Sequence, residues 1–217
     1  LEPEADNADA ILQAWYPGEM GGRAVADVLY GDYNPSGKLP VTFYRHDSDL
    51  PDFQDYSMKN RTYRYFTGDA LFPFGYGLSY TKFDVKPQEF KNGHLLVSVA
   101  NTGSRPGTEV VQMYIRRPQD VNGPIKTLRA FKRVDVQPGT TKTVDMGLVG
   151  DTEHLQLWDS STNTMKFIPG DYEFYIGTSS KRSDLKKYTM TISKVEPAPV
   201  ESSKNKYSSA ESSDDDW

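Results

Sequence analysis

The sequence predicts a mixed fold, in which a short strand-helix-strand (βαβ) unit is followed by an all-β sandwich. Apolar residues recur at helical spacing once within residues 1–46, between two short apolar runs. After residue 80, apolar residues alternate along several short segments with no helical pattern between them. The 17 Gly, 14 Pro and 14 Tyr also favour short strands joined by tight turns.

The first segment, residues 1–46, is expected to be the end of an α/β sandwich domain. Ala10–Tyr16 is an apolar run closed by Pro17-Gly18, which predicts a buried strand and a turn. Residues 19–30 are predicted to form a helix that ends at Gly31, and Leu39–Tyr44 a second strand. One apolar face of this helix carries Met20, Ala24, Val25, Val28 and Leu29. Because a parallel sheet needs several such units, this one is expected to be a terminal fragment.

Residues 47–80 are rich in aromatic side chains, Pro, Asp and Gly but show no regular period. So many aromatic side chains favour a linker that packs on a domain surface.

Residues 81–194 are predicted to form a two-sheet sandwich of immunoglobulin or fibronectin type. Turn-forming pairs such as Pro138-Gly139 and Pro169-Gly170 separate its alternating segments. The apolar faces of five segments are Leu95, Val97 and Val99; Val111, Met113 and Ile115; Val144, Met146 and Leu148; Tyr172, Phe174 and Ile176; and Tyr188, Met190 and Ile192. Residues 195–217 are Ser-, Lys- and acid-rich, which predicts a disordered tail.

The charge and composition exclude several classes of function. A net charge of -5 disfavours nucleic-acid binding, and no apolar run reaches the roughly 20 residues that span a bilayer. A neutral ligand such as a sugar fits better. The absence of Cys excludes disulfides and thiolate metal sites but leaves the compartment open. Residue 1 is Leu, so we expect the chain to be truncated, with any signal peptide upstream.

Several motifs, in order along the chain, closely resemble glycoside hydrolase family 3. The resemblance extends over about residues 8–194. In the first eighty residues it rests on Trp15-Tyr-Pro-Gly18, Asn34-Pro-Ser-Gly-Lys-Leu-Pro40 and Phe74-Gly-Tyr-Gly-Leu-Ser-Tyr80. In the sandwich it rests on Asn101-Thr-Gly103, Glu109-Val-Val-Gln112, Leu128 to Phe131, Pro138-Gly139 and Ile176-Gly177.

The resemblance implies an exo-acting retaining β-glycosidase, a β-xylosidase or β-glucosidase, with a barrel, an α/β sandwich and a fibronectin type III-like domain. It also implies that the nucleophilic Asp and the acid/base Glu lie upstream, so that this chain holds no catalytic residue. The implied partners are the N-terminal barrel and α/β domain of the same polypeptide and an oligosaccharide substrate, without nucleic acid or membrane. No cofactor is implied, and the expected location is periplasmic or secreted.

A few residues are candidates for function. Tyr63, Tyr65 and Phe66 offer flat faces that can stack on sugar rings, although burial between domains is the simpler reading for such large side chains. Glu19 stands at a helix start, where a first-turn dipole contact is the simpler reading. The Asp residues of 47–55 lack the Gly and distal Glu of a calcium loop, and His46, His94 and His154 lack a second ligand at metal spacing.

Three functions compete at this point. The first is the end of a β-glycosidase, and the Arg61–Phe66 stretch slightly favours the β-xylosidase side. The alternative from another class is a non-catalytic carbohydrate-binding or adhesion module, which a β-sandwich can form by itself. The third is a structural domain that supports the enzyme. The βαβ unit discriminates, because a free-standing binding module needs no piece of a parallel sheet.

Overall fold

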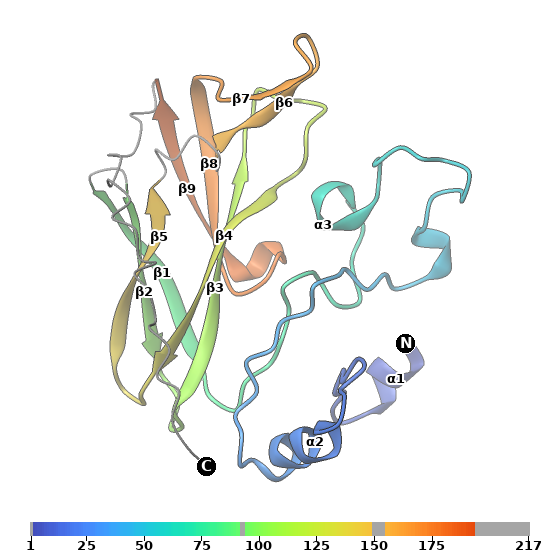
Figure 1. Ribbon diagram of the computed structural model, residues 1–217, viewed down its shortest axis with the longest axis vertical. Helices are drawn as coiled ribbons and strands as arrows, with labels where there is room; N and C mark the ends of the chain where they lie inside the picture. Colours follow the sequence, from blue (N-terminus) through green and yellow to red (C-terminus); the bar gives the residue numbers. More distant parts are fainter. Residues whose placement is uncertain (1, 92–93, 149–154, 194–217) are drawn as a thin grey trace, which may run out of the picture.

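A computed structural model of the chain describes residues 2–91, 94–148 and 155–193. Strands dominate from residue 83 onward, and the short helices belong mainly to an extended N-terminal arm, residues 2–80. In Figure 1 the arm runs from blue to cyan-green beside the sandwich and adds no strand to either sheet. The structure is therefore a β-sandwich flanked by an arm.

Two antiparallel sheets form the sandwich (Figure 1). The first has the order β1 (Phe83–Lys91), β2 (His94–Asn101), β5 (Thr141–Leu148). The second has the order β4 (Thr127–Val136), β3 (Gly107–Arg116), β8 (Gly170–Gly177), β9 (Leu185–Ile192). A separate two-stranded ribbon consists of β6 (Leu157–Asp159) and β7 (Thr164–Lys166).

The core lies between the two sheets. Burial alternates strictly along β2, where Leu95, Val97 and Val99 point inward. Side chains of both sheets, together with Leu155 from the connection before β6, complete the core, which includes Val85, Val111, Met113, Ile115, Val136, Met146, Leu155, Tyr172, Phe174 and Ile176. Each large apolar side chain removed from water contributes about 1.5–3 kcal/mol, so these residues are the main source of stability.

All five segments predicted from alternation are strands, which confirms the two-sheet prediction. The two other long strands, β1 and β4, lacked a clean alternation. β1 is an edge strand that contains Pro87, and its register shifts between Pro87 and Glu89. β4 is also at an edge and exposes Phe131, Lys132 and Arg133, so its pattern carries little apolar signal.

The predicted helix forms as α2 (Gly21–Tyr30). Gly31 ends it in the left-handed conformation at φ 81°, and its N–H donates to the Val28 carbonyl. Three further short helical segments lie in the arm: α1 (Glu2–Asn7), η1 (Asp47–Asp49) and α3 (Thr62–Tyr65). A fourth, η2 (Arg182–Asp184), precedes β9.

The strand predicted for Ala10–Tyr16 was wrong. This segment is irregular, and Ile11, Leu12 and Trp15 are 43–52% exposed. A strand needs a hydrogen-bonded neighbour, and no backbone hydrogen bond joins residues 10–16 to another segment in the part of the chain that the structure describes. The apolar pattern is real, but the structure places no sheet against it.

The strand predicted for Leu39–Tyr44 was also wrong, because this segment pairs with the linker. Leu39 and Phe43 exchange backbone hydrogen bonds with residues 72–76, and a single antiparallel bridge joins Phe43 to Phe72. Pro40 and Pro73 lack N–H groups, so a continuous ladder cannot form between the two segments. Of the βαβ unit, only the helix forms.

Residues 62–75 pack against the second sheet. The Tyr63 ring stacks on Phe74 with centroids 4.2 Å apart and meets Tyr114 of β3 edge-on at 5.6 Å. The Ile125 N–H donates to the Arg64 carbonyl at 2.7 Å.

The predicted tail, residues 195–217, lies outside the described residues. None of the described helices is long and apolar enough to cross a membrane.

Candidate functional site

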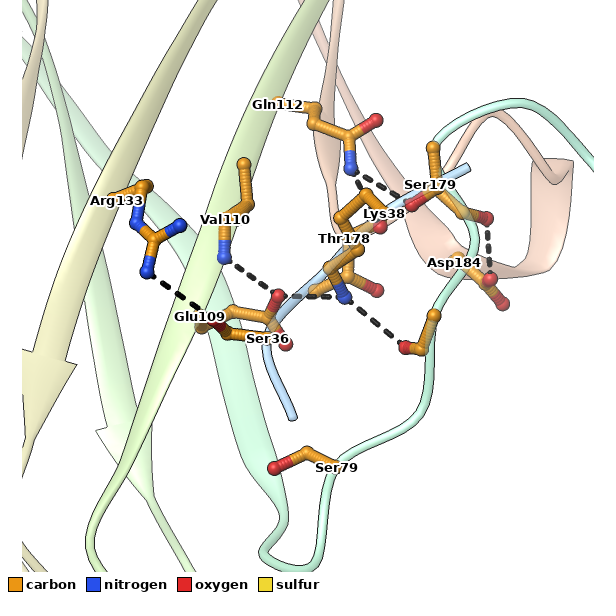
Figure 2. Close-up of polar contacts among 12 residues, drawn as sticks. Ser36, Lys38, Ser79, Glu109, Val110, Gln112, Arg133, Thr178, Ser179 and Asp184 are labelled. Atoms are coloured by element: carbon orange, nitrogen blue, oxygen red, sulfur yellow. Dashed lines mark hydrogen bonds and ion pairs between the residues drawn. The ribbon is translucent and has the colours of Figure 1, made fainter. Parts of the chain in front are cut away.

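A polar junction joins the arm to the sandwich where three stretches of chain converge on β3 (Figure 2). The stretches are residues 34–38 and 75–80 of the arm and residues 178–180 after β8. We call this set the junction, and its main side chains are those of Asn34, Lys38, Glu109 and Gln112.

Lys38 and Glu109 form a buried ion pair at the centre of the junction. Lys38 Nζ lies 2.8 Å from Glu109 Oε1, and the two side chains are only 12% and 7% exposed. Lys38 Nζ also donates to the Gly77 carbonyl at 3.1 Å, as Figure 2 shows by the dashed line toward the linker. Glu109 also accepts the Val110 N–H at 2.7 Å, so its carboxylate is engaged in structural contacts.

Gln112 of β3 links two loops to the sheet. Its Nε2 donates to the Gly75 carbonyl at 3.0 Å and to the Thr178 carbonyl at 2.7 Å. Its Oε1 accepts from the Tyr114 hydroxyl at 2.5 Å. Burial raises the pKa of Tyr114, so this hydroxyl remains a donor across the physiological range.

Asn34, in the first half of the arm, forms hydrogen bonds to the linker (residues 47–80) and to the sandwich. Its Oδ1 accepts from the Ser79 hydroxyl at 3.0 Å and the Tyr80 N–H at 2.8 Å, and its Nδ2 donates to the Pro106 carbonyl at 3.0 Å. The sequence predicted only a turn at this position. A short polar residue before Pro is typical of a turn, and its side chain is also free to bond to distant segments. The local sequence predicts the turn but not the distant partners.

Two glycines permit the close approach of chains at the junction. Gly75 has φ 78°, and a Cβ there would lie 2.0 Å from Gln112 Oε1. At Gly77 a Cβ would lie 2.1 Å from the Gly37 carbonyl oxygen. The Gly75-Tyr76-Gly77 sequence is thus explained by backbone packing and not by phosphate binding.

A pocket of about 330 Å³ lies beside the junction, between the linker and the sandwich. Tyr63, Phe66 and Asp69 line its linker side, and Lys126 and Arg182 line the opposite side. Thr42 also lines it, and the Thr42 hydroxyl oxygen is buried with no hydrogen-bond partner among the described residues.

The structure brings two of the three predicted sugar-contacting residues to this pocket. Tyr63 and Phe66 line it, whereas Tyr65 does not. The Tyr63 ring also stacks on Phe74, and its hydroxyl accepts a hydrogen bond from the Leu128 N–H at 3.0 Å. These two contacts fix the position of the ring. The Phe66 ring packs edge-on against Tyr44 at 4.8 Å.

The remaining candidates are dispersed. Glu19 is exposed on the turn before α2. The four Asp residues of 47–55 cap local N–H groups or face solvent, while His46 pairs with Glu2 at 3.2 Å and His94 with Asp145 at 2.7 Å. His154 lies outside the described residues. Nowhere in the described ranges do three or more His, Cys, Asp or Glu side chains gather as a metal site requires.

Comparison with known protein families decides the assignment. Residues 1–80 match the glycosyl hydrolase family 3 C-terminal domain, and residues 109–180 match the fibronectin type III-like domain. The chain belongs to glycoside hydrolase family 3. The predicted fold class is thereby confirmed: the end of the family 3 α/β domain followed by a fibronectin type III-like sandwich.

Curated relatives in family 3 extend over nearly the whole chain. The xylan 1,4-beta-xylosidase of Xylanibacter ruminicola is 56% identical over 88% of this chain, which covers 23% of the relative. The periplasmic beta-glucosidase of Salmonella typhimurium is 40% identical over 84% of this chain and 26% of the relative. The chain thus spans about a quarter of the length of these relatives.

Solved structures agree with the sequence comparison. The beta-glucosidase of Kluyveromyces marxianus superposes with a TM-score of 0.79 at 32% identity, over 88% of this chain and 25% of that chain. Beta-glucosidase 3B of Thermotoga neapolitana gives the same TM-score and identity over 89% of this chain and 30% of that chain. The arm and the sandwich together therefore resemble one region of family 3 enzymes.

Proposed function

We propose that the polypeptide containing this chain is an exo-acting retaining β-glycosidase that removes terminal non-reducing β-linked sugars from oligosaccharides. The observation that carries the proposal is the 56% identity to a xylan 1,4-beta-xylosidase along both the arm and the sandwich. That relative favours a β-xylosidase, with β-glucosidase as the second assignment because other relatives carry that name.

Within such an enzyme, we assign this chain a structural role without catalytic carboxylates. A retaining mechanism needs two free carboxyl groups about 5–5.5 Å apart, one as nucleophile and one as acid/base. Glu109 is held by Lys38, and Asp184 accepts the Ser179 hydroxyl at 2.6 Å. These two acids hold loops. The support for placing the nucleophile and acid/base on the N-terminal barrel and α/β domain is that the chain spans only about a quarter of the length of its relatives.

The exposed apolar side chains of the arm support attachment to those domains. Tyr16, Met20, Leu29 and Tyr30 are 58–102% exposed on or near α2. A cluster of this kind marks a surface that another protein layer covers. We propose that the rest of the α/β domain covers it.

We propose a periplasmic or secreted location for the whole enzyme. The support is the Salmonella typhimurium relative, whose name places it in the periplasm.

The intact polypeptide tests the proposed activity. We expect it to hydrolyse 4-nitrophenyl β-xyloside faster than 4-nitrophenyl β-glucoside, and the first sugar released, followed by proton NMR, to be the β-anomer. Release of the α-anomer first would exclude a retaining mechanism, and no hydrolysis of either glycoside would exclude the proposed function.

A further inference from the structure

The pocket between linker and sandwich has a cationic wall. Lys126 is half-buried, and it lies with the exposed Lys181 and Arg182 on the sandwich side. Among the described residues, none of these three cationic side chains forms an ion pair or hydrogen bond. A second hollow of about 300 Å³ shares Lys126 and Arg182, but there Glu173 is already paired with Lys187 and Arg116. The excess positive charge is therefore concentrated at Lys126 and Arg182.

Lys126 and Arg182 lie close together with no ion pair to an anion among the described residues, and this arrangement is costly for the Lys126 charge. Burial, with a further contribution from the neighbouring Arg182 guanidinium, lowers the pKa of the Lys126 ammonium. A bound anion would relieve both causes, because it compensates the lost hydration and offsets the repulsion. An Arg fork beside a Lys is well suited to a carboxylate, which an Arg binds through two parallel hydrogen bonds.

The opposite wall suits a sugar ring better than a bare anion. Phe66 and Tyr63 contribute aromatic surface, on which the C–H face of a pyranose can stack. Thr42 supplies a buried hydroxyl that has no partner, and the Asp69 carboxylate, 82% exposed and 3.5 Å from Arg45, accepts hydroxyl donors. Because Asp69 lies on the wall opposite the cations, an anion that also carries hydroxyls and an apolar ring face fits the pocket better than phosphate does.

The geometry points to a binding site for a hexuronic acid, free or as a side group of an oligosaccharide. Its carboxylate lies against Lys126 and Arg182, its ring against Phe66, and its hydroxyls toward Thr42 and Asp69. The inference rests on the proposed function, because it assumes a saccharide ligand. Uronate binding is measured without hydrolysis, so a failure of binding and a failure of glycosidase activity can be told apart.

The test is an NMR titration of the ¹⁵N-labelled 217-residue chain with three probes: D-glucuronate, D-glucose and inorganic phosphate. Glucuronate and glucose share a pyranose ring and differ at the carboxylate, while phosphate is an anion without a ring. We expect saturable shifts at Lys126 and Ser180–Ser183 with glucuronate, and at least about tenfold weaker binding of the other two, since one charge-assisted contact is worth about a factor of ten or more.

Matched variants locate the site. Arg182→Gln is exposed and should weaken glucuronate binding about tenfold, and Lys126→Met, which keeps the length of the side chain, should do the same. Lys142→Gln, an exposed change on β5, should leave binding unchanged, and thermal melts confirm that each variant is folded. Equal binding of glucose would overturn the carboxylate assignment, equal binding of phosphate would overturn the sugar assignment, and unsaturable glucuronate shifts would overturn the site.

Discussion

At the scale of single residues, we expect the Lys38–Glu109 pair to hold the junction closed, because both of its charges are buried. Glu109→Gln leaves the Lys38 ammonium buried without its counter-charge. We predict a loss of about 3–5 kcal/mol in the free energy of unfolding, measured by urea denaturation. The control is Asp27→Asn, which removes the exposed Arg23–Asp27 pair, 74% and 40% exposed, and should cost less than about 1 kcal/mol.

A double variant separates the charge from the packing. Lys38→Met with Glu109→Leu removes both charges and keeps most of the volume, so it should recover much of the stability lost in Glu109→Gln. If Glu109→Gln costs no more than Asp27→Asn, the ion pair does not hold the junction.

Gly75 allows a second residue-scale prediction. Gly75→Ala combines a left-handed backbone with a clash against Gln112, whereas Gly139→Ala has φ 69° but open space around it. We predict a cost of about 1 kcal/mol for Gly139→Ala and clearly more for Gly75→Ala, measured by thermal denaturation. Equal costs would mean that Gln112 moves aside freely and that the close approach is unimportant.

Residue-scale contacts were the least accessible to sequence reasoning. Lys38 and Glu109 are 71 residues apart in the sequence, so no local sequence pattern predicts their ion pair. Aromatic faces suit sugars, which predicts a role for Tyr63 and Phe66, but no sequence motif surrounds Lys126, Arg182 or Thr42. Their meeting depends on how the linker packs on the sandwich, which the order of residues does not reveal.

At the scale of elements, the arm and the sandwich differ in how well their apolar residues are covered. Residues 10–16 are irregular and largely exposed, whereas β3 buries Val111, Met113 and Ile115 between two neighbouring strands. We predict that amides of residues 10–16 exchange with solvent far faster than those of residues 110–115. Hydrogen exchange of the monomeric chain, followed by mass spectrometry, measures both, and equal protection would show that the arm is self-sufficient.

The elements show where periodicity predicts structure and where it does not. The five strands form where the pattern predicts them because the two sheets bury their apolar faces against each other. The helix α2 also forms, although Met20 and Leu29 of its predicted apolar face stay exposed, because its backbone hydrogen bonds are made within the helix itself. Ala10–Tyr16 and Leu39–Tyr44 carry the same kind of pattern, yet no sheet lies beside them. An apolar run shows that a segment is suited to burial, but the neighbour that buries it must be known independently.

At the scale of the whole molecule, the sandwich carries its own core and the arm does not. We propose that residues 81–194 form an independent folding unit, because the inner faces of the two sheets cover each other. Expressed alone, this segment should melt in one cooperative transition with well-dispersed amide signals. A broad transition with poor dispersion would mean that the sandwich depends on the junction contacts of the arm.

We propose that this chain supports a β-glycosidase without supplying its catalytic carboxylates. The most direct measurement is the rate of 4-nitrophenyl β-xyloside hydrolysis by the 217-residue chain alone, beside the intact polypeptide at equal concentration. We predict turnover by the intact polypeptide and none above the buffer rate by the chain. Turnover by the chain that survives repurification and is lost in Glu19→Gln would contradict the claim.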